Sequence, residues 1–265
     1  MPLICLASPK GGVGKTTLAA NLAHALRRAG WPVVALDLDP QNALRLHFGI
    51  PLADTAGFLA EPGRDWRSAL RPTAAGVDLL PHGTTDLRGA LATAGALERE
   101  PELIAAPLRA LLADPALVVV ADTPPGPSHA LSALAPLASL VIAVLLADAA
   151  STALLPDIES GRFLGRGTLG NLYATRLRVV LNQVDYHSRL SIASAEAMAA
   201  HLGPRLLGAV ARDEALAEAL ACQRLLAECA PASAAAQDIA DIARGIAALL
   251  HAEAPGAGGL AWRAR

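Results

Sequence analysis

The stretch Pro9-Lys10-Gly11-Gly12-Val13-Gly14-Lys15-Thr16-Thr17 decides the fold, because it joins an apolar run to a helical pattern through a glycine-rich turn. It also contains the only two lysines of the chain, Lys10 and Lys15, among 22 lysine and arginine residues. Everywhere else the positive charges are arginines. The planar guanidinium of arginine does not replace a compact ammonium group that must fit between phosphate oxygens. Lysine at these two positions therefore indicates a site for a nucleoside triphosphate.

A glycine-rich turn between a strand and a helix lets backbone N–H groups close around a phosphate, and the helix N-terminus adds partial positive charge. Lys15 would reach the β- and γ-phosphates, and the Thr16 hydroxyl would bind Mg²⁺. The strict pattern G-x-x-x-x-G-K-[ST] is not met, because Pro9 occupies its first glycine position. The residues expected to bind nucleotide in this loop are Gly11, Gly12, Val13, Gly14, Lys15, Thr16 and Thr17.

Two strand ends supply the carboxylates that a magnesium-bound triphosphate requires. An apolar run delivers Asp122 to the carboxyl edge of the sheet, where it would hold the water shell of the metal. Asp37 and Asp39 end a second apolar run and are two residues apart, so they point to one side of an extended strand. One of them would position the attacking water, and the other would support the metal or the loop. The expected metal-binding residues are Thr16, Asp37 and Asp122.

Short runs of Val, Ile and Leu without polar alternation recur between helical patterns along the chain. Such runs are buried on both faces, which predicts an α/β fold with a doubly wound, mostly parallel sheet and helices on both faces. The predicted strands are residues 3–7, 33–37, 77–80, 117–121, 140–146, 178–181 and 206–210. The predicted helices are residues 14–29, 101–113, 128–137, 191–202 and 233–250.

The sequence predicts one domain over residues 1–253, followed by a tail, 254–265, that we expect to be mobile. Residues 53–76 are rich in Pro, Gly and polar residues, so they are expected to leave the sheet. No residue between His129 and Asp148 is charged, but Pro136 interrupts this stretch, which favours a short helix and a buried strand over a membrane span. No signal peptide is expected, because the chain enters the first apolar run at once.

Composition narrows the function classes. A formal net charge of −2 gives no overall basic field that would attract nucleic acid or acidic lipid. Three cysteines with no C-x-x-C pair argue against a disulfide framework and fit a reducing compartment. Eight aromatic residues, counted as three Trp, two Tyr and three Phe, make stacking on single-stranded nucleic acid improbable.

The glycine loop with its early lysine resembles that of the ParA/MinD class of P-loop ATPases, the deviant Walker A group of the SIMIBI class. This resemblance covers nearly the whole chain and implies a homodimer in which two subunits enclose two ATP molecules with Mg²⁺. Lys10 matches the signature lysine, which crosses to the phosphates of the partner, and Lys15 matches the ordinary P-loop lysine. Asp39 matches the water-positioning aspartate, and Asp122 the aspartate on the magnesium side. The resemblance thus implies catalytic roles for Lys10, Lys15 and Asp39.

Two further segments resemble the base-binding parts of that class. Leu181-Asn182-Gln183-Val184-Asp185 resembles its base-reading segment, which makes Asn182 the expected partner of the adenine amino group. Val210-Ala211-Arg212-Asp213 stands where the class has an Ile-Pro-Arg stretch closing over the base. Arg212 and Asp213 are therefore expected to contact nucleotide, although Ala211 departs from the usual proline.

Within the class, four stretches are most similar to the BcsQ (YhjQ) subgroup, ATPases that are encoded with bacterial cellulose synthase. They are residues 39–49, 65–67, 77–83 and 145–151. This resemblance implies a cytoplasmic regulator with slow ATP hydrolysis that acts through protein partners on cellulose secretion and the membrane-embedded synthase. Those partners would recruit it to the inner membrane face, without a membrane segment of its own and without direct contact to nucleic acid.

A DNA-partitioning ParA is the alternative function. Such a protein needs a basic surface on its dimer, and residues 162–189 form the only arginine-dense stretch that is poor in acidic residues. A run of this kind is more often a solvated face than a nucleic-acid site. A membrane-binding regulator of the MinD type would need a basic amphipathic C-terminal helix, and residues 258–265 are too short for one.

Overall fold

The structure is a computed structural model that describes residues 2–60, 65–161 and 175–253. The described residues form an eight-stranded sheet with the order β3-β4-β2-β5-β1-β6-β7-β8. Every pair of neighbouring strands is parallel except β3 with β4. The strands are β1 (Leu3–Ala7), β2 (Val33–Asp37), β3 (Arg71–Pro72), β4 (Asp78–Leu80), β5 (Val118–Asp122), β6 (Leu140–Leu146), β7 (Leu177–Val184) and β8 (Leu206–Ala211). The predicted fold class is confirmed.

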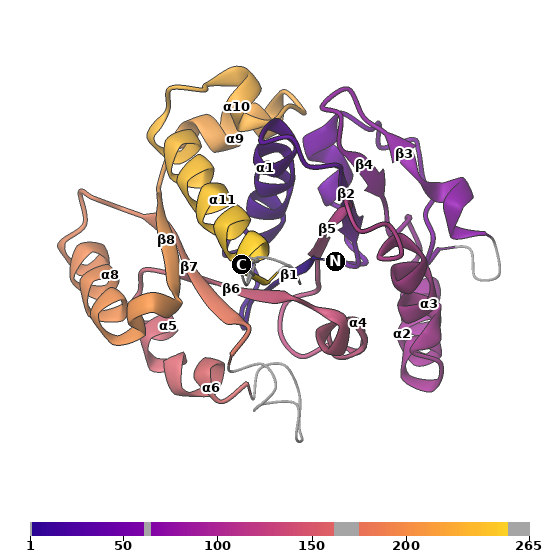
Figure 1. Cartoon of the computed structure of the whole chain (residues 1–265), viewed down its shortest axis with the longest axis horizontal. Helices are drawn as coiled ribbons and strands as arrows, with labels where there is room; N and C mark the ends of the chain where they lie inside the picture. The colour runs from indigo at the N-terminus through magenta and orange to yellow at the C-terminus, as the bar shows by residue number, and fades with distance from the viewer. Residues whose placement is uncertain (1, 61–64, 162–174, 254–265) are drawn as a thin grey trace, which may run out of the picture.

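Helices cover both faces of this sheet (Figure 1). They are α1 (Lys15–Arg28), α2 (Leu87–Arg99), α3 (Glu102–Leu111), α4 (His129–Leu134), α5 (Ala149–Ala153), α6 (Leu155–Glu159), α8 (Arg189–Leu202), α9 (Glu214–Ala221), α10 (Leu226–Cys229) and α11 (Ala234–Glu253). Short 3-10 helices lie at Leu44–Phe48, Trp66–Ala69, Ala135–Leu137 and Gly203–Arg205.

The strand alternation of β1 explains why the sheet needs two layers of helices. Leu3 and Cys5 point into one hydrophobic cluster, together with buried residues of α2, α3, α4, α6 and α8. Ile4 and Leu6 point into a second cluster, which is completed by α1 and α11. Because all five residues of β1 are buried, neither face of the strand tolerates a polar side chain. The continuous apolar runs in the sequence therefore follow directly from the two-layer covering.

Each predicted strand segment overlaps a strand of the sheet, and each predicted helix overlaps a helix or, at 135–137, a helix continued by a 3-10 turn. The structure adds β3, which lies within the stretch 53–76 that was expected to leave the sheet. It also adds the helices α2, α5, α6, α9 and α10. In α2 the helical pattern is obscured because two glycines interrupt it and the side chains of Leu87 and Leu91 are exposed. The predicted tail, 254–265, lies outside the described residues. Within the described part of the chain, no helix is both long and apolar enough to cross a membrane.

The stretch that follows β2 returns to pack tightly on the end of β4. The backbone N–H of Phe58 donates to the Pro81 carbonyl at 3.1 Å, and that of Leu59 donates to the His82 carbonyl at 3.1 Å. A Cβ atom on Gly57 would overlap the backbone of Gly83, which itself has a φ of +92°. Only glycine at position 57 permits this approach.

We therefore expect the Gly57→Ala substitution to lower the free energy of unfolding by about 2 kcal/mol or more, because two backbones must separate. The matched control is Gly245→Ala, since Gly245 lies in α11 with open space around its Cα. There alanine should stabilise the helix by up to about 1 kcal/mol. Urea denaturation of both variants measures the difference, and equal effects at the two positions would contradict the close approach.

Candidate nucleotide-binding site

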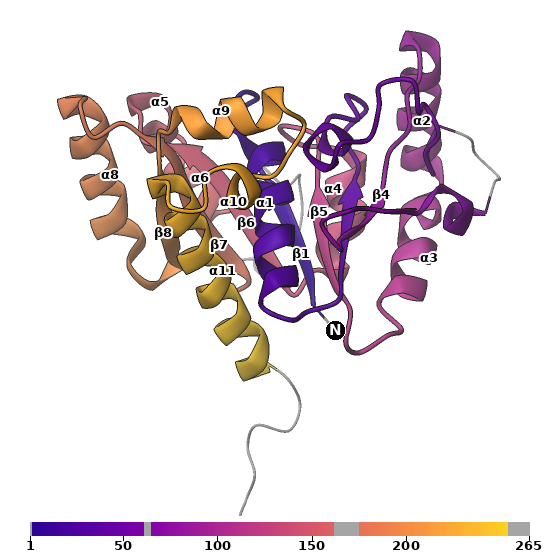
Figure 2. The same ribbon diagram turned by 90° about the horizontal axis from the view of Figure 1, so that it is seen from above.

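The predicted site residues meet at the carboxyl edge of the sheet, around the point where the strand order changes direction. β1 lies between β5 and β6. The strands β2 to β5 lie on one side of β1, and the later strands β6 to β8 lie on the other side. In open α/β sheets, ligands bind in the crevice at such a switch point. Figure 2 shows α1 beginning at this edge, opposite the edge at which β1 starts. The residues of interest follow β1, β2, β5, β6 and β7 there.

The glycine loop forms one wall of a cleft of about 510 Å³. Gly12 and Gly14 have φ values of +76° and +80°, which only glycine adopts readily. The Ser8 hydroxyl donates to the Lys10 carbonyl at 2.8 Å, and the Gly126 N–H donates to the Ser8 carbonyl at 2.7 Å, so the loop is held from both sides. The cleft is lined by Ser8, Lys10, Gly11, Gly12, Val13, Gly14, Lys15, Thr16, Thr17, Asp39, Gln41, Pro125 and Gln183.

Lys15, Thr16 and Asp122 form a buried cluster beneath the loop. The Lys15 Nζ lies 2.6 Å from Asp122 Oδ1, and the Thr16 hydroxyl donates to Asp122 Oδ2 at 2.6 Å. Lys15 is 6% exposed and Asp122 is fully buried. Burial raises the pKa of Asp122, although the Lys15 charge opposes that effect. A hydroxyl and a carboxylate side by side are oxygen ligands of the kind that Mg²⁺ prefers, so these residues fit the predicted metal.

Asp37 and Asp39 occupy different environments. Asp37 is fully buried beside Asp122 on the neighbouring strand, and its two oxygens accept the backbone N–H groups of Asp39 and Leu44, both at 3.0 Å. Burial first, and then the negative charge of Asp122, raises the pKa of Asp37. Asp39 is half-buried and lines the cleft. Asp37 therefore supports the loop after β2 through both of its oxygens, and its role as a metal-binding residue stays a prediction. Asp39 is the carboxylate that can reach a water in the cleft.

Lys10 sits at the rim of the cleft and is 32% exposed. Its Nζ lies 3.3 Å from Asp148 Oδ2, and Asp148 caps α5 by accepting the Ser151 N–H at 2.6 Å. Burial alone would raise the pKa of Asp148, but the hydrogen bonds from Ser151 and the charge of Lys10 lower it. Sequence reasoning assigned no role to Asp148. The position of Asp148 directly before a helical stretch predicts an N-cap. Its contact with Lys10 joins two residues that are 138 positions apart in the sequence, so no local pattern predicts it.

The side chain of Asn182 ties the end of β7 to the glycine loop. Its Nδ2 donates to the Val13 carbonyl at 2.7 Å, and the residue is 4% exposed. A Cβ atom on Gly14 would overlap this amide, so Gly14 is required by packing as well as by its φ. The Oδ1 of Asn182 remains as an acceptor, which is what an adenine amino group needs.

The structure does not bring Asp213 to the cleft. Its Oδ1 accepts the Ala215 N–H at 3.0 Å and its Oδ2 accepts the Ala235 N–H at 3.3 Å, so Asp213 joins the starts of α9 and α11. Arg212 is 71% exposed and lies 3.7 Å from Asp185, at a smaller pocket beside the cleft. Both pockets are lined by Gln183, to which sequence reasoning gave no role.

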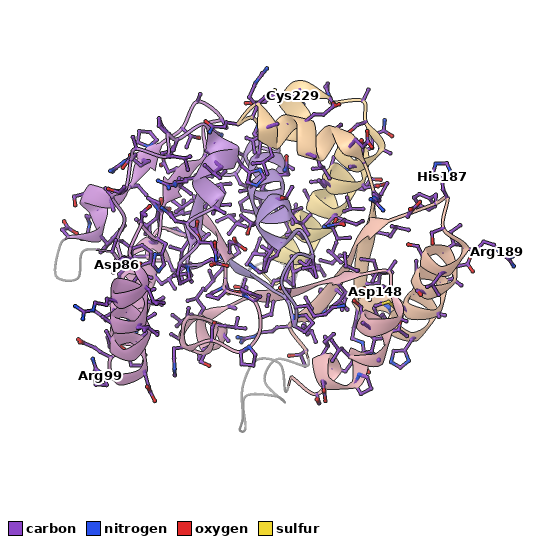
Figure 3. All side chains as sticks on the ribbon, turned by 180° about the vertical axis from the view of Figure 1, so that it is seen from behind. Asp86, Arg99, Asp148, His187, Arg189 and Cys229 are labelled. Atoms are coloured by element: carbon purple, nitrogen blue, oxygen red, sulfur yellow. The ribbon has the colours of Figure 1, made fainter. Side chains whose placement is uncertain are left out.

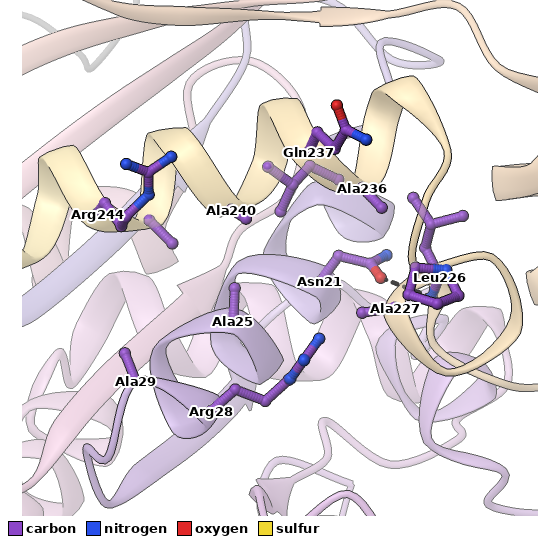
Figure 4. Close-up of a pocket in the computed structure, with 13 residues that line it drawn as sticks. Asn21, Ala25, Arg28, Ala29, Leu226, Ala227, Ala236, Gln237, Ala240 and Arg244 are labelled. Carbon is purple, nitrogen blue, oxygen red and sulfur yellow. Dashed lines mark hydrogen bonds between the residues drawn. The ribbon is translucent and has the colours of Figure 1, made fainter.

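A further pocket of about 390 Å³ lies between α1 and α11 (Figure 4). Six of its 13 lining residues are alanines, and Arg28 and Arg244 lie at its rim. Asn21 of α1 lines this pocket and links α1 to α10. Its Oδ1 accepts the Leu226 N–H at 2.9 Å, and its Nδ2 donates to the Thr17 carbonyl at 2.8 Å. None of the predicted site residues lines this pocket.

The buried pair generates a pH-dependent prediction. Removing Lys15 leaves two buried carboxylates, Asp37 and Asp122, without a cation, so Lys15→Ala should lower the free energy of unfolding by about 3 kcal/mol at neutral pH. The folded-state pKa values of both aspartates lie above their ordinary values, so protonation relieves the penalty. The loss should therefore shrink as the pH falls from 7.5 towards 5.

Urea denaturation at both pH values measures this, with Lys10→Ala as the control, since its exposed pair with Asp148 contributes under about 1 kcal/mol. An effect of Lys15→Ala that is the same at both pH values would show that the aspartates are not charged in the folded state.

The sequence profile of the family described as "Cellulose biosynthesis protein BcsQ" matches residues 1–245. The chain is 38% identical over 85 residues to the BcsQ protein of Salmonella typhi, a match that spans 31% of this chain and about a third (34%) of that relative's length. It is 34% identical over 244 residues to the chromosome-partitioning ATPase Soj of Thermus thermophilus, covering 87% of this chain and 89% of Soj.

Among solved structures, the fold resembles the septum site-determining protein MinD of Pyrococcus horikoshii, which was determined with Mg-ADP. The TM-score is 0.74 at 24% identity, over 96% of this chain and 99% of that one. At this identity the likeness establishes the fold alone. The profile match covers the fold from the first strand into the last helix, and on that ground the chain belongs to the BcsQ family.

Proposed function

We propose that this protein is a nucleotide switch: it binds ATP with Mg²⁺, dimerises on the bound nucleotide and hydrolyses it slowly. The observation that carries the proposal is the contrast between its two lysines. Lys15 is buried against Asp122, whereas Lys10 is partly exposed at the rim of the cleft in a weak pair with Asp148. A cation at the rim of one cleft can exchange its partner for the phosphates of a second subunit at small cost.

Each residue has a distinct task in this proposal. The N–H groups of the glycine loop and the start of α1 hold the phosphates, and Lys15 moves from Asp122 to the β- and γ-phosphates. Thr16 and Asp122 hold Mg²⁺, which when bound neutralises the charge that develops on the phosphates. Asp37 keeps the loop after β2 in place through its two backbone hydrogen bonds. Asp39 orients the attacking water, and loss of the γ-phosphate then loosens the dimer.

The biological process that we propose is regulation of cellulose secretion at the bacterial inner membrane, from the cytoplasmic side and through protein partners. Membership of the BcsQ family supports this, together with the P-loop lysines and the aspartates, which this chain retains. The dimer would be the form that its partners recognise, because the nucleotide is part of the interface and stabilises it by mass action.

The Lys10→Ala variant tests the switch. We expect its affinity for ATP to stay within about threefold of wild type, because Lys15 and the loop hold the phosphates of their own subunit. ATP-dependent dimerisation should weaken by at least about tenfold, which corresponds to 1.4 kcal/mol. Sedimentation in MgATP and in MgADP measures the dimer, and nucleotide titration measures the affinity.

Asp148→Asn is the matched variant, because asparagine keeps the cap of α5 but removes the charge that holds Lys10. It should dimerise at a lower ATP concentration than wild type. If Lys10→Ala dimerises like wild type, Lys10 does not complete the site of a second subunit and the proposal is wrong.

DNA partitioning is the second candidate, favoured by the similarity to Soj along most of the chain. Of the arginine-dense stretch, Arg176 and Arg178 donate to backbone carbonyls at 2.9 to 3.0 Å, and Arg189 is exposed. Arg162 and Arg166 lie outside the described residues. The carbonyl contacts give two of these arginines a structural task, which favours the protein-recruiting switch.

The Asp39→Ala variant, which should remain an ATP-bound dimer, separates the two functions. We expect no binding to non-specific duplex DNA, even at low salt. Binding that requires ATP and falls steeply with salt concentration would indicate phosphate contacts through counterion release and would support partitioning. The wild type with ADP is the control for binding that does not depend on the switch.

A further inference from the structure

A second cavity lies directly behind the loops that line the nucleotide cleft. It has a volume of about 280 Å³ and is formed by the loop after β2, the end of β4, the loop after β5 and the helices α2 and α4. Figure 3 shows α2 at the periphery of the molecule, where Asp86 and Arg99 mark its two ends. Ala94 of α2 and His129 of α4 are exposed, so the cavity opens to solvent between these helices. None of the residues that the sequence predicts for the nucleotide site lines it.

The buried part of the cavity wall is apolar except for Thr93 and His82. The Thr93 hydroxyl donates to the Leu59 carbonyl at 3.5 Å. His82 is 1% exposed, and its Nδ1 lies 2.9 Å from the Gly83 carbonyl oxygen. Because a carbonyl oxygen only accepts, Nδ1 carries a proton and donates it to this bond. Thr93 and the Nδ1 of His82 are therefore satisfied within the protein.

The Nε2 atom of His82 is the polar group that this arrangement leaves over. Burial lowers the pKa of His82, although its bond to Gly83 and the charge of Asp39 oppose that effect, so the imidazole is neutral at neutral pH. With its proton on Nδ1, a neutral imidazole keeps a lone pair on Nε2. Across the described part of the chain, no group donates to this atom. An acceptor in an apolar cavity is costly unless a donor meets it.

These features define the chemistry of a ligand. Small-molecule sites are concave and mostly apolar, with a few polar groups that fix the orientation of the ligand. A carboxylate or a phosphate would present a further acceptor to Nε2, and an ammonium group would lose its hydration among apolar walls. An aromatic ring with one N–H or O–H combines an apolar body with the donor that His82 requires.

The cavity and the nucleotide cleft share two loops as a common wall. Asp39 lines the cleft, whereas its neighbour Leu38 lines the cavity. In the loop after β5, Pro125 lines the cleft and Pro124 lines the cavity. The Leu38 N–H donates to the Asp122 carbonyl at 2.9 Å and so joins the loop after β2 to the end of β5. A ligand in the cavity would therefore pack against the back of the loop that carries Asp39.

We propose that this cavity is a regulatory site for a ligand with an aromatic ring and one N–H or O–H donor, which binds to Nε2 of His82. Occupancy keeps Leu38 in place and thereby holds Asp39 where it orients the attacking water, so that hydrolysis becomes faster. The regulatory step rests on the proposed function, because it needs ATP hydrolysis, whereas binding of the ligand does not. A free small molecule and an aromatic side chain of a partner protein offer the same chemistry.

NMR titration of the isotopically labelled full chain with indole tests the site without nucleotide. N-methylindole is the matched ligand, since it keeps the ring system but has no N–H. Indole should bind at least about threefold more tightly, and His82→Phe should abolish this preference because phenylalanine has a ring without an acceptor. N-acetyltryptophanamide separates the two sources of ligand. It should bind as tightly as indole if a partner side chain is the ligand, and at least about tenfold more weakly if a free molecule is.

Two alanines of α2 provide variants that leave the buried wall intact. Both are exposed, but Ala94 lines the cavity and Ala92 does not. Ala94→Leu should weaken indole binding by at least about fivefold, because the larger side chain occupies the cavity, and Ala92→Leu should leave it unchanged. Equal effects of the two substitutions, or equal affinity of the wild type for indole and N-methylindole, would overturn the inference.

Hydrolysis of MgATP with and without saturating indole tests the regulation. The rate should rise by at least about twofold in the wild type and in Ala92→Leu, and it should stay constant in Ala94→Leu. An unchanged rate in the wild type with indole bound would refute the regulatory role. If the protein neither binds nor hydrolyses MgATP, the proposed function is wrong, whereas the indole titration still decides whether the cavity is a ligand site.

Discussion

The buried ion pair between Lys15 and Asp122 is the interaction on which the site depends. It connects the first residue of α1 to the last residue of β5, so it aligns the glycine loop with the centre of the sheet. Asp37 and Asp122 are register partners on adjacent strands, and two carboxylates at such a distance cannot both be charged in a dry interior without a cation. Lys15 supplies that cation, and a nucleotide that draws Lys15 away must bring one of its own. In the proposed function, the magnesium ion that accompanies the triphosphate would restore this charge balance.

The same reasoning explains why lysine persists at two positions in a chain that otherwise uses arginine. At position 15 the ammonium group must fit beneath the loop and pass from a carboxylate to phosphates, which a wide, flat guanidinium cannot do without displacing the loop. At position 10 the requirement is different, because the side chain stands at the rim and is partly hydrated. Its pair with Asp148 is within the range of surface pairs and stores little energy. In the proposed switch, a strong pair there would hold Lys10 within the free subunit and oppose its transfer to the phosphates of a second subunit.

Much of this arrangement could be predicted from the sequence, because the physics that produces it is local. The runs before Asp37 and Asp122 are apolar because both faces of those strands are covered. The glycines of the loop indicate that its backbone adopts positive φ values. What could not be predicted depends on contacts between distant segments. Asp148 is an ordinary helix cap in the sequence, and only the fold brings it to Lys10. Asp213 resembles a nucleotide contact by its place in a motif, yet its two oxygens are taken by the N–H groups that begin α9 and α11. Short β3 has too few residues for any pattern.

The coupling between the two ends of the cleft also follows from packing. Gly14 must be glycine for its φ and for the Asn182 amide that rests against it, so the loop and the end of β7 are packed and hydrogen-bonded together. The ion pair between Arg212 and Asp185 is more exposed, so opening it removes one weak surface contact that does not involve the glycine loop. A change at Asn182 would alter both ends together. Phosphate binding is therefore expected to depend on the identity of residue 182 as well as on the loop itself.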